Sequence, residues 1–255
     1  MSSDPNRQAY WLLKTVNQAI RDHQMIQPGD RVAVAVSGGK DSLSLLRLLQ
    51  LRQRSSAGAY TLAAIHVLGD ALGPAAAPHP PLEAWLAASG VPVLFAPLRL
   101  PEGETPPLNC QRCTWNRRRT LFEAAQRLDC NVIAFGHHAD DLAQTTLMNL
   151  IQHGLVEGMA PSRDYFDGAL RLIRPLCLTR EKDLRRFARA CDFPTPPPLC
   201  PQSDHTRRKL AAGWVEQMER ACPQAATNLL RAGLKNLSGP EQKKTPGSAF
   251  KDDSY

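Results

Sequence analysis

The fold is decided by one stretch of sequence, Val32-Ala33-Val34-Ala35-Val36-Ser37-Gly38-Gly39-Lys40-Asp41-Ser42. Valines alternate with alanines up to Val36, and because neither face is polar, the run predicts a central parallel strand buried on both sides. Leucines then recur at helical spacing, at Leu43, Leu46 and Leu49. The two glycines therefore lie in a strand-to-helix turn, where unpaired N–H groups and the helix dipole favour an anion. Phosphate is the anion we expect.

The turn is not a Walker A loop, because Gly-x-x-x-x-Gly-Lys-Ser/Thr is absent. Asp41 directly follows Lys40, and a carboxylate repels a phosphate unless a cation lies between them, so we expect magnesium. The alternative is a glycine turn that closes an ordinary strand–helix unit. The stretch resembles the signature Ser-Gly-Gly-x-Asp-Ser of the PP-loop ATP pyrophosphatases. This resemblance implies cleavage of ATP between its α and β phosphates, adenylation of a substrate oxygen, and nucleotide binding by Ser37, Gly38, Gly39, Lys40, Asp41 and Ser42.

Composition and charge narrow the class of protein. The 255 residues are 43% hydrophobic, which suits one α/β domain with short additions. No apolar run approaches the roughly 18 residues of a membrane helix, and the polar start is no signal peptide, so we expect a cytoplasmic protein with no membrane partner. Seven cysteines without an export signal favour metal binding or catalysis over disulfides. The formal net charge of +7 favours a polyanionic partner.

Strand and helix patterns alternate along the chain. Apolar runs predict five strands, at residues 32–36, 61–67, 91–96, 131–136 and 170–176. Helical spacing predicts a helix after the glycine turn and others at 10–23, 82–89, 114–128, 140–153, 179–190 (capped by Thr179), 205–220 and 224–234. Segments 69–81, 97–109 and 193–201 have the composition of loops.

This alternation predicts an α/β fold with a doubly wound, mostly parallel five-stranded sheet and helices on both faces. In the strand order 3-2-1-4-5, the first and fourth strands are neighbours at the switch point where ligands bind. We divide the chain into an N-terminal helical segment (1–29), a PP-loop domain (30–192), a cysteine-bearing loop with C-terminal helices (193–237) and a disordered tail (238–255).

A second cluster of polar residues follows the fourth predicted strand, Gly136-His137-His138-Ala139-Asp140-Asp141. The strand order brings it next to the glycine turn. A carboxylate there can hold magnesium, orient a nucleophile or accept a proton. Zinc suits the aspartates less well than a harder ion does. The alternative is a helix whose first turn is acidic for ordinary reasons, with incidental histidines.

The third cluster consists of cysteines. Cys110-Gln111-Arg112-Cys113 is a Cys-x-x-Cys pair, and Cys200 lies in the late proline-rich loop. Spacing leaves three readings open: zinc, an iron–sulfur cluster with one iron open, or a redox pair.

The ordered set of motifs resembles the tRNA 2-thiocytidine synthetases, a PP-loop family with the adenine nucleotide alpha hydrolase-like fold. Beside the glycine turn and the two clusters, it includes Arg117-Arg118-Arg119, Ile173-Arg174-Pro175-Leu176, Arg180-Glu181-Lys182-Asp183 and Phe193-Pro194. The resemblance implies replacement of the C2 oxygen of an anticodon-loop cytidine by sulfur. It also implies tRNA, ATP, Mg²⁺ and a 4Fe-4S cluster, a sulfur donor such as a cysteine desulfurase, and a homodimer.

The resemblance also assigns residues. It makes Cys110, Cys113 and Cys200 the cluster ligands, although this chain keeps only the last cysteine of the family's late Cys-x-x-Cys. Gly136 and His137 join the nucleotide site, and Asp41 or Asp140 holds magnesium. Relatives that make 2-thiouridine imply catalytic roles for Arg117 and Asp140, and we predict Asp41 as a third catalytic residue. The expected tRNA surface, each residue of which could equally be a solvated helix face, comprises Arg117, Arg118, Arg119, Arg185, Arg186, Arg189, Arg207, Arg208 and Lys209.

Three alternatives to this function stay open. A 2-thiouridine synthetase would use the same motifs, whereas another PP-loop ligase such as a lysidine synthetase would not need the three cysteines. A non-catalytic nucleotide-binding protein would carry a structural zinc ion in place of the cluster.

Overall fold

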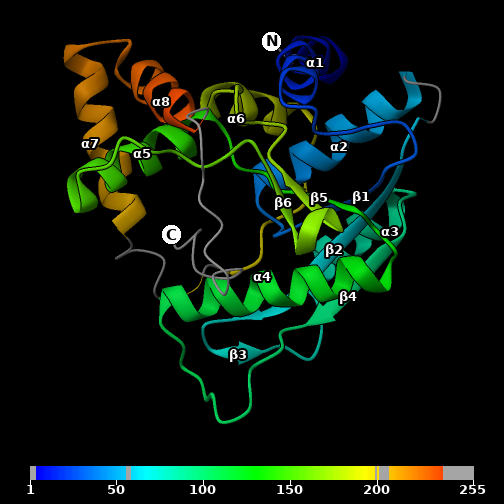
Figure 1. Ribbon diagram of the computed structural model, residues 1–255. Coiled ribbons are helices and arrows are strands. Elements are labelled where there is room, and N and C mark those ends of the chain that lie inside the picture. Colours follow the sequence, from blue (N-terminus) through cyan, green and yellow to red (C-terminus); the bar gives the residue numbers. More distant parts are fainter. Residues whose placement is uncertain (1–3, 56–58, 199, 201–206, 238–255) are drawn as a thin grey trace.

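A computed structural model describes residues 4–55, 59–198, 200 and 207–237. A twisted sheet runs through the middle, and helices lie on both sides of it (Figure 1). The elements follow in the order α1 (Pro5–Asp22), β1 (Arg31–Ala35), α2 (Lys40–Ser55), β2 (Thr61–Asp70), β3 (Gly73–Pro74), α3 (Pro80–Ala88), β4 (Val93–Pro97), α4 (Cys110–Arg127), β5 (Val132–Ala134), α5 (Ala139–His153), β6 (Ser162–Tyr165), η1 (Phe166–Gly168), β7 (Leu170–Ile173), α6 (Glu181–Ala190), α7 (Arg207–Ala221) and α8 (Ala225–Asn236).

Five parallel strands form the body of the sheet in the order β4-β2-β1-β5-β7. This confirms the predicted order 3-2-1-4-5. The first and fourth predicted strands, β1 and β5, are hydrogen-bonded neighbours. Their carboxyl ends meet at one edge, so the turn after β1 and the turn after β5 open onto the same place.

Two short antiparallel strands extend the sheet beyond the prediction and make it a mixed, seven-stranded sheet. β3 pairs with the end of β2 inside the segment 69–81 that was predicted to be a loop, and β6 pairs with β7. β3 has only two residues and β6 has four, which is too short for alternation of apolar and polar residues to be visible in the sequence.

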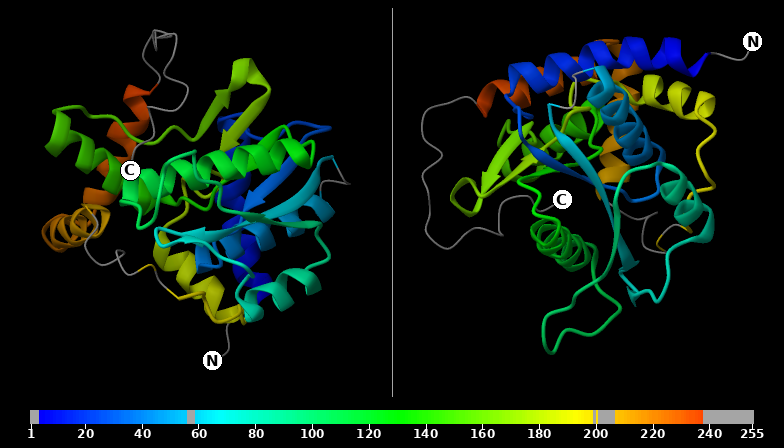
Figure 2. Two further views of the ribbon diagram at one scale, coloured as in Figure 1. Left: turned by 90° about the horizontal axis from the view of Figure 1, so that it is seen from below. Right: turned by 90° about the vertical axis from the view of Figure 1, so that its right-hand side faces the viewer.

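β1 separates two hydrophobic cores. Val32 and Val34 lie in the core that includes side chains of α1, α2, α3 and α6, whereas Ala33 lies in the core that includes α4. Figure 2 shows α4 on the opposite side of the sheet from α1, α2 and α6. Leu121 and Phe122 of α4 belong to the same core as Ala33. The predicted burial of this strand on both faces is confirmed.

The predicted starts of α1, α4 and α6 were wrong. α1 begins at Pro5 instead of residue 10, because Asp4 caps it by accepting the N–H of Asn6 at 2.9 Å. α4 begins at Cys110 instead of residue 114, because Asn109 caps it by accepting the N–H of Arg112 at 2.8 Å. Thr179 does not cap α6, since the N-cap position belongs to Arg180 and the Thr179 hydroxyl shares a hydrogen bond with Thr15 at 3.0 Å.

The helices α7 and α8 pack on α5 around a small apolar cluster of Ala143, Leu147, Val215 and Ala226. α1 contributes to the same core as α2 and α6. The boundaries drawn from the sequence stay predictions, and the tail 238–255 lies outside the described residues. Among the described helices, none has the length and apolar character needed to cross a membrane.

Candidate functional site

Ser42 organises the glycine turn. Its hydroxyl donates to the carbonyl of Gly39 at 2.9 Å, accepts the N–H of Ser37 at 3.2 Å, and lies 3.1 Å from the Ser37 hydroxyl. These contacts fold the turn back over the start of α2. The conformation needed for an anion site at a helix N-terminus is therefore built by the turn itself.

Two other segments pack directly against this turn. A Cβ on Gly38 would lie 2.7 Å from Cδ of Pro197, which belongs to the loop that carries Cys200. A Cβ on Gly136 would lie 3.0 Å from the backbone nitrogen of Ser42. The close approach of these neighbours requires glycine at both positions. Three segments therefore meet here: the glycine turn, the end of β5 and the cysteine-bearing loop.

Lys40 sits between two carboxylates. Its ammonium lies 2.9 Å from Oδ2 of Asp41 and 2.9 Å from Oε1 of Glu181, at the start of α6. Burial lowers the pKa of Lys40, but the hydrogen bonds to these carboxylates outweigh that effect and leave it raised. Burial raises the pKa of Glu181, yet the bonds to Lys40 and Arg185 lower it to about 2. The charges that would meet a phosphate are thus paired with each other.

Asp140 is occupied by contacts to α6. Its Oδ2 accepts the N–H of Glu181 at 2.7 Å, so Asp140 caps that helix from α5. Its Oδ1 lies 2.9 Å from the guanidinium of Arg180, which also reaches Glu219 of α7 at 2.8 Å. The predicted catalytic aspartate therefore links three helices, and its position is fixed by them.

Asp41 has one carboxylate oxygen that its ion pair with Lys40 does not use. Its Oδ1 is buried and has no hydrogen-bond partner among the described residues, and the same is true of Nδ1 of His138. His138 lies between carboxylates, with Nε2 3.5 Å from Oδ2 of Asp141 and 3.9 Å from Oδ2 of Asp41. An unpaired carboxylate oxygen beside the glycine turn has the chemistry of a magnesium ligand. Sequence reasoning did not include His138 in the site.

His137 is held by a buried arginine. Nε of Arg174 lies 3.3 Å from Nδ1 of His137, and Arg174 itself is 1% exposed. The ring of His137 stacks on Phe135 with an interplanar angle of 2°. Burial, and then the charges of Arg174, Arg208 and Arg118, hold the pKa of His137 well below its usual value. A neutral ring that accepts from Arg174 at Nδ1 carries its proton on Nε2.

Two of the three predicted cysteine ligands lie at the start of α4, and the third, Cys200, is near enough for its charge to act on Cys113. Cys110 and Cys113 lie in its first turn. Burial raises the pKa of the Cys113 thiol, the charge of Arg117 opposes this, and the nearby Cys200 and Cys110 raise it further. The position of the Arg117 side chain is fixed, because its guanidinium donates to the carbonyl of Gly69 at the end of β2. Arg117 thus lies beside the thiols.

The chemistry of the three predicted ligands suits an iron–sulfur cluster, since all three are thiols. Among the described residues, however, no group of three or more His, Cys, Asp or Glu side chains is already arranged to hold a metal ion. Residues 199 and 201–206, on either side of Cys200, lie outside the described part of the chain.

The predicted tRNA-binding arginines differ in their contacts. Three of them are paired with acidic neighbours on their own helix: Arg119 with Glu123, Arg185 with Glu181 and Arg186 with Asp183. Arg118 and Arg208 lie near His137, where their charges act on its pKa.

Comparison with known proteins identifies the family. A family model described as a PP-loop domain matches residues 12–194. A tRNA-cytidine(32) 2-sulfurtransferase of Anaeromyxobacter dehalogenans (strain 2CP-C) is 37% identical over 231 residues, which cover 87% of this chain and 77% of that protein. The chain belongs to the PP-loop family of tRNA-cytidine 2-sulfurtransferases. Proteins of the same name from Sodalis glossinidius and Xanthomonas campestris pv. campestris (strain 8004) are each 36% identical.

The chain spans 64% of the Sodalis protein and 78% of the Xanthomonas protein. Among solved structures, the U34-tRNA thiolase NcsA from Methanococcus maripaludis, with its 4Fe-4S cluster, superposes with a TM-score of 0.73 at 22% identity. The match covers 93% of this chain and 82% of that one. This likeness confirms the α/β fold.

Sequence reasoning quoted Arg174 and Glu181 as parts of motifs but gave neither a role in the site. Arg174 carried a readable signal, because it lies between Ile173 and Pro175 inside the last predicted strand. A charge in such a place requires a specific partner. Glu181 carried none, since its contact with Lys40 joins residues 141 positions apart.

Proposed function

We propose that this protein is an ATP-dependent tRNA sulfurtransferase that converts cytidine 32 of the anticodon loop to 2-thiocytidine. The observation that carries the proposal is the packing of Pro197, from the Cys200 loop, against Gly38 of the nucleotide turn. Adenylation takes place on the C2 oxygen and sulfur then bonds to C2 itself, so the two sites have to lie side by side. The names of the relatives supply the modified nucleoside, cytidine, and its position, 32.

ATP would bind with its phosphates on the turn from Ser37 to Ser42. Lys40 would exchange its bonds to Asp41 and Glu181 for the phosphates, and the buried Oδ1 of Asp41 would take Mg²⁺. The C2 oxygen of the base then attacks the α-phosphorus, and pyrophosphate leaves. The oxygen, which cannot leave as oxide, now departs as part of AMP when sulfur bonds to C2.

Cys110, Cys113 and Cys200 would hold the 4Fe-4S cluster, which supplies, when bound, a place from which sulfur reaches the activated carbon. Arg117 beside the thiols, and the Nε2–H of His137, are donors that can offset negative charge on the phosphate or the leaving AMP. Asp140, with both oxygens engaged by α6, supports the site by fixing Arg180 and Glu181.

Further parts of the proposal concern partners. The substrate is a tRNA, the sulfur comes from a donor such as a cysteine desulfurase, the protein forms a homodimer, and its reaction takes place in the cytoplasm. Magnesium accompanies ATP.

The test is anaerobic reconstitution of the full chain with iron and sulfide, followed by incubation with unmodified tRNA, ATP, Mg²⁺ and sulfide. Nucleoside mass spectrometry should detect 2-thiocytidine in the wild type. Cys113→Ala should abolish the product while ATP binding persists, and Cys222→Ala, which removes an exposed thiol on no predicted ligand position, should retain it. A colourless protein that binds zinc and makes no 2-thiocytidine would contradict the proposal, and 2-thiouridine as product would correct the target.

A further inference from the structure

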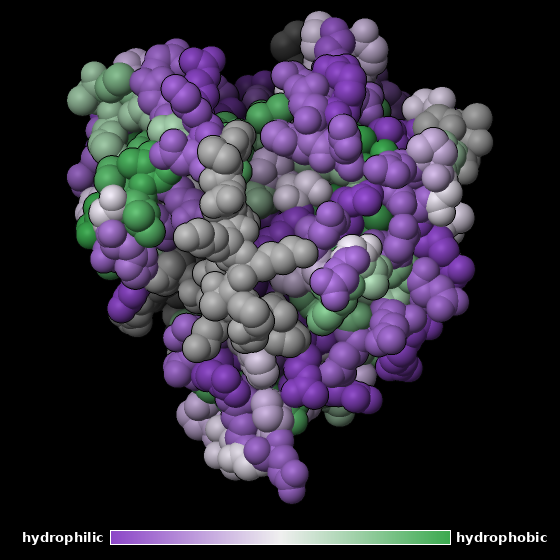
Figure 3. Space-filling view, viewed as in Figure 1, coloured by the Kyte–Doolittle hydropathy of each residue, from purple (hydrophilic) through white to green (hydrophobic). Residues whose placement is uncertain are grey.

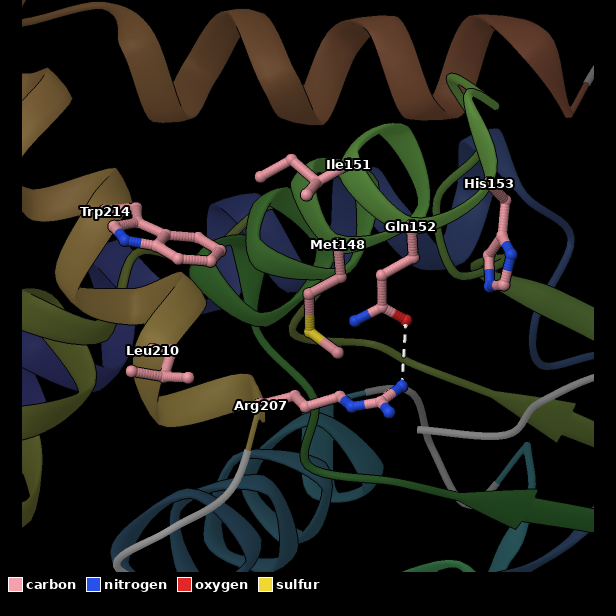
Figure 4. Close-up of a pocket in the computed structure, with 7 residues that line it drawn as sticks. All are labelled: Met148, Ile151, Gln152, His153, Arg207, Leu210 and Trp214. Carbon is pink, nitrogen blue, oxygen red and sulfur yellow. Dashed lines mark hydrogen bonds between the residues drawn. The ribbon is translucent and has the colours of Figure 1, made fainter.

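A pocket between α5 and α7 has no role in the chemistry described above. Its volume is about 450 Å³, and it is lined by Met148, Ile151, Gln152, Arg207, Leu210 and Trp214 among others. Figure 4 shows the Trp214 and Leu210 side chains on α7 facing the Met148 side chain on α5, with the Arg207 guanidinium at the lower edge. The pocket is large enough for a nucleobase and part of its sugar.

The rim of the pocket is unusually apolar for a surface. Leu210 is 58% exposed, Ile151 is 56% exposed and Trp214 is 42% exposed. Apolar side chains gather over α5 and α7 on the left of the face in Figure 3. Clustered exposed side chains of this kind mark a binding surface, and an accessible indole is a stacking platform for a flat, unsaturated ligand.

Polar groups select the kind of ligand. Arg207 donates to the side-chain oxygen of Gln152 at 3.3 Å, so a guanidinium and an amide stand together beside the indole. The sequence at the start of α7 is Arg207-Arg208-Lys209, which adds positive charge next to the pocket. An aromatic platform with amide and guanidinium groups and a basic approach fits an unpaired base on a phosphate backbone.

The start of α7 connects this pocket to the nucleotide site. Nη1 of Arg208 lies 3.9 Å from Oδ1 of Asp141, in the first turn of α5, whereas Arg207 reaches Gln152 near the end of the same helix. Ten residues separate His138 from Met148, which is roughly 15 Å along a helix. An RNA strand with one nucleotide at the site would therefore meet the pocket within a few nucleotides.

A second copy of the chain fits this face less well. In a symmetric dimer the same patch lies on both subunits, so the basic start of each α7 would approach the other. Like charges brought together at an interface are costly, whereas an RNA backbone neutralises them.

We propose that the pocket of Trp214 and Arg207 binds an unpaired base of the tRNA anticodon loop, a few nucleotides from the cytidine that is modified. The base stacks on the indole of Trp214, and Arg207 and Gln152 hydrogen-bond to its edge or to its phosphate. This proposal rests on the proposed function and adds to it a second contact that sets the register of the loop.

The experiment compares variants of the full-length reconstituted protein by their affinity for an unmodified tRNA transcript with cytidine at position 32. Trp214→Ala should raise Kd about 10-fold, because loss of base stacking on an aromatic side chain typically weakens binding ~5- to 150-fold. Trp214→Phe should restore most of the affinity. The matched control is Trp11→Ala, which removes another exposed tryptophan (57% exposed, on α1) and should leave Kd unchanged.

Three results would overturn the proposal. Trp214→Ala could bind tRNA as tightly as the wild type, Trp11→Ala could weaken binding equally, or Trp214→Ala could convert a wild-type dimer to a monomer in light scattering while tRNA affinity is retained. The last result would assign the face to a second copy. If the wild type itself neither binds nor thiolates tRNA, the proposed function fails too. If it thiolates tRNA while Trp214→Ala is indistinguishable from it, only the pocket assignment fails.

Discussion

Gly38 is the residue at which the nucleotide turn and the cysteine-bearing loop touch. Its φ is +88°, a region that other residues rarely adopt, and any Cβ there would meet the ring of Pro197. Gly39 differs, since a Cβ there would lie 3.4 Å from the Ser37 hydroxyl, in ordinary contact. The two adjacent glycines thus serve different purposes.

We expect Gly38→Ala to lower the free energy of unfolding by about 1–2 kcal/mol, because the residue is held in the left-handed region. Displacement of Pro197 should add to this. Chemical denaturation measures the loss, and Gly39→Ala is the comparison, with a smaller expected effect. Equal destabilisation by the two alanines would mean that the contact with Pro197 does not constrain the turn.

The ion pair of Glu181 with Lys40 predicts how the stability of the protein changes in acid. The pKa of Glu181 is lowered from 4.5 to about 2, so the folded state favours the ionised form. The resulting stabilisation is fully present above pH 4.5 and is lost as the pH falls toward 2. We expect the difference in stability between wild type and Glu181→Gln, measured by urea unfolding, to shrink across that interval. A constant difference from pH 6 down to the acid limit would contradict the pairing with Lys40.

At the scale of elements, α5 is the helix that joins the site to the C-terminal helices. Its first turn carries Asp140, which caps α6, and its later turns receive α7 and α8. The contact with α8 is close, because a Cβ on Gly233 would overlap the Thr146 hydroxyl and lie 3.1 Å from Cα of Gly158. A shift of α8 would therefore displace side chains of α5.

Gly233→Ala should push α8 away from α5 and destabilise the protein by about 1–3 kcal/mol, the usual cost of overpacking. Gly213 on α7 provides the matched control, since a Cβ there would meet no heavy atom of the described residues within 4 Å. Gly213→Ala should stabilise the helix by about 0.5–1 kcal/mol. Thermal denaturation measures both changes, and a neutral Gly233→Ala would show that α8 is not seated on α5.

At the scale of the whole molecule, positive charge from separate helices acts on His137. The formal net charge is +7, and Arg118 of α4 and Arg208 of α7 both act on the pKa of His137. Long-range attraction of this kind suits a polyanion larger than ATP. It also makes affinity depend on salt, since bound RNA releases counterions.

We expect log Kd for tRNA to rise linearly with log salt concentration, and Arg118→Gln to reduce the magnitude of the slope by about 0.7–1. Arg220→Gln is the control, because Arg220 lies in the last turn of α7 and pairs with Glu216 at 2.9 Å. Titrations at several salt concentrations measure the slopes. An unchanged slope for Arg118→Gln would place the RNA backbone elsewhere.

The amino-acid sequence by itself determined the five parallel strands and the glycine turn between β1 and α2. Both depend on short-range features, such as the alternation of valine and alanine up to Val36 and the pair Gly38-Gly39, which act within a few residues. The strand order came from the pattern usual for nucleotide-binding sheets, which the structure confirms. Sequence reasoning missed β3, β6 and the start of α4 at Cys110, where the elements are short or depend on a single cap.

Only the tertiary structure decided which residues of the site contact one another. It revealed that Asp140 caps another helix, that Lys40 is shared by Asp41 and Glu181, that Arg174 holds His137, and that Pro197 rests on Gly38. Apart from the pairing of the adjacent Lys40 and Asp41, these contacts join residues far apart in sequence. The partner of a charge or of an absent Cβ leaves no local pattern. Such contacts exist only after the chain has folded, because burial and packing, and not local propensity, select them.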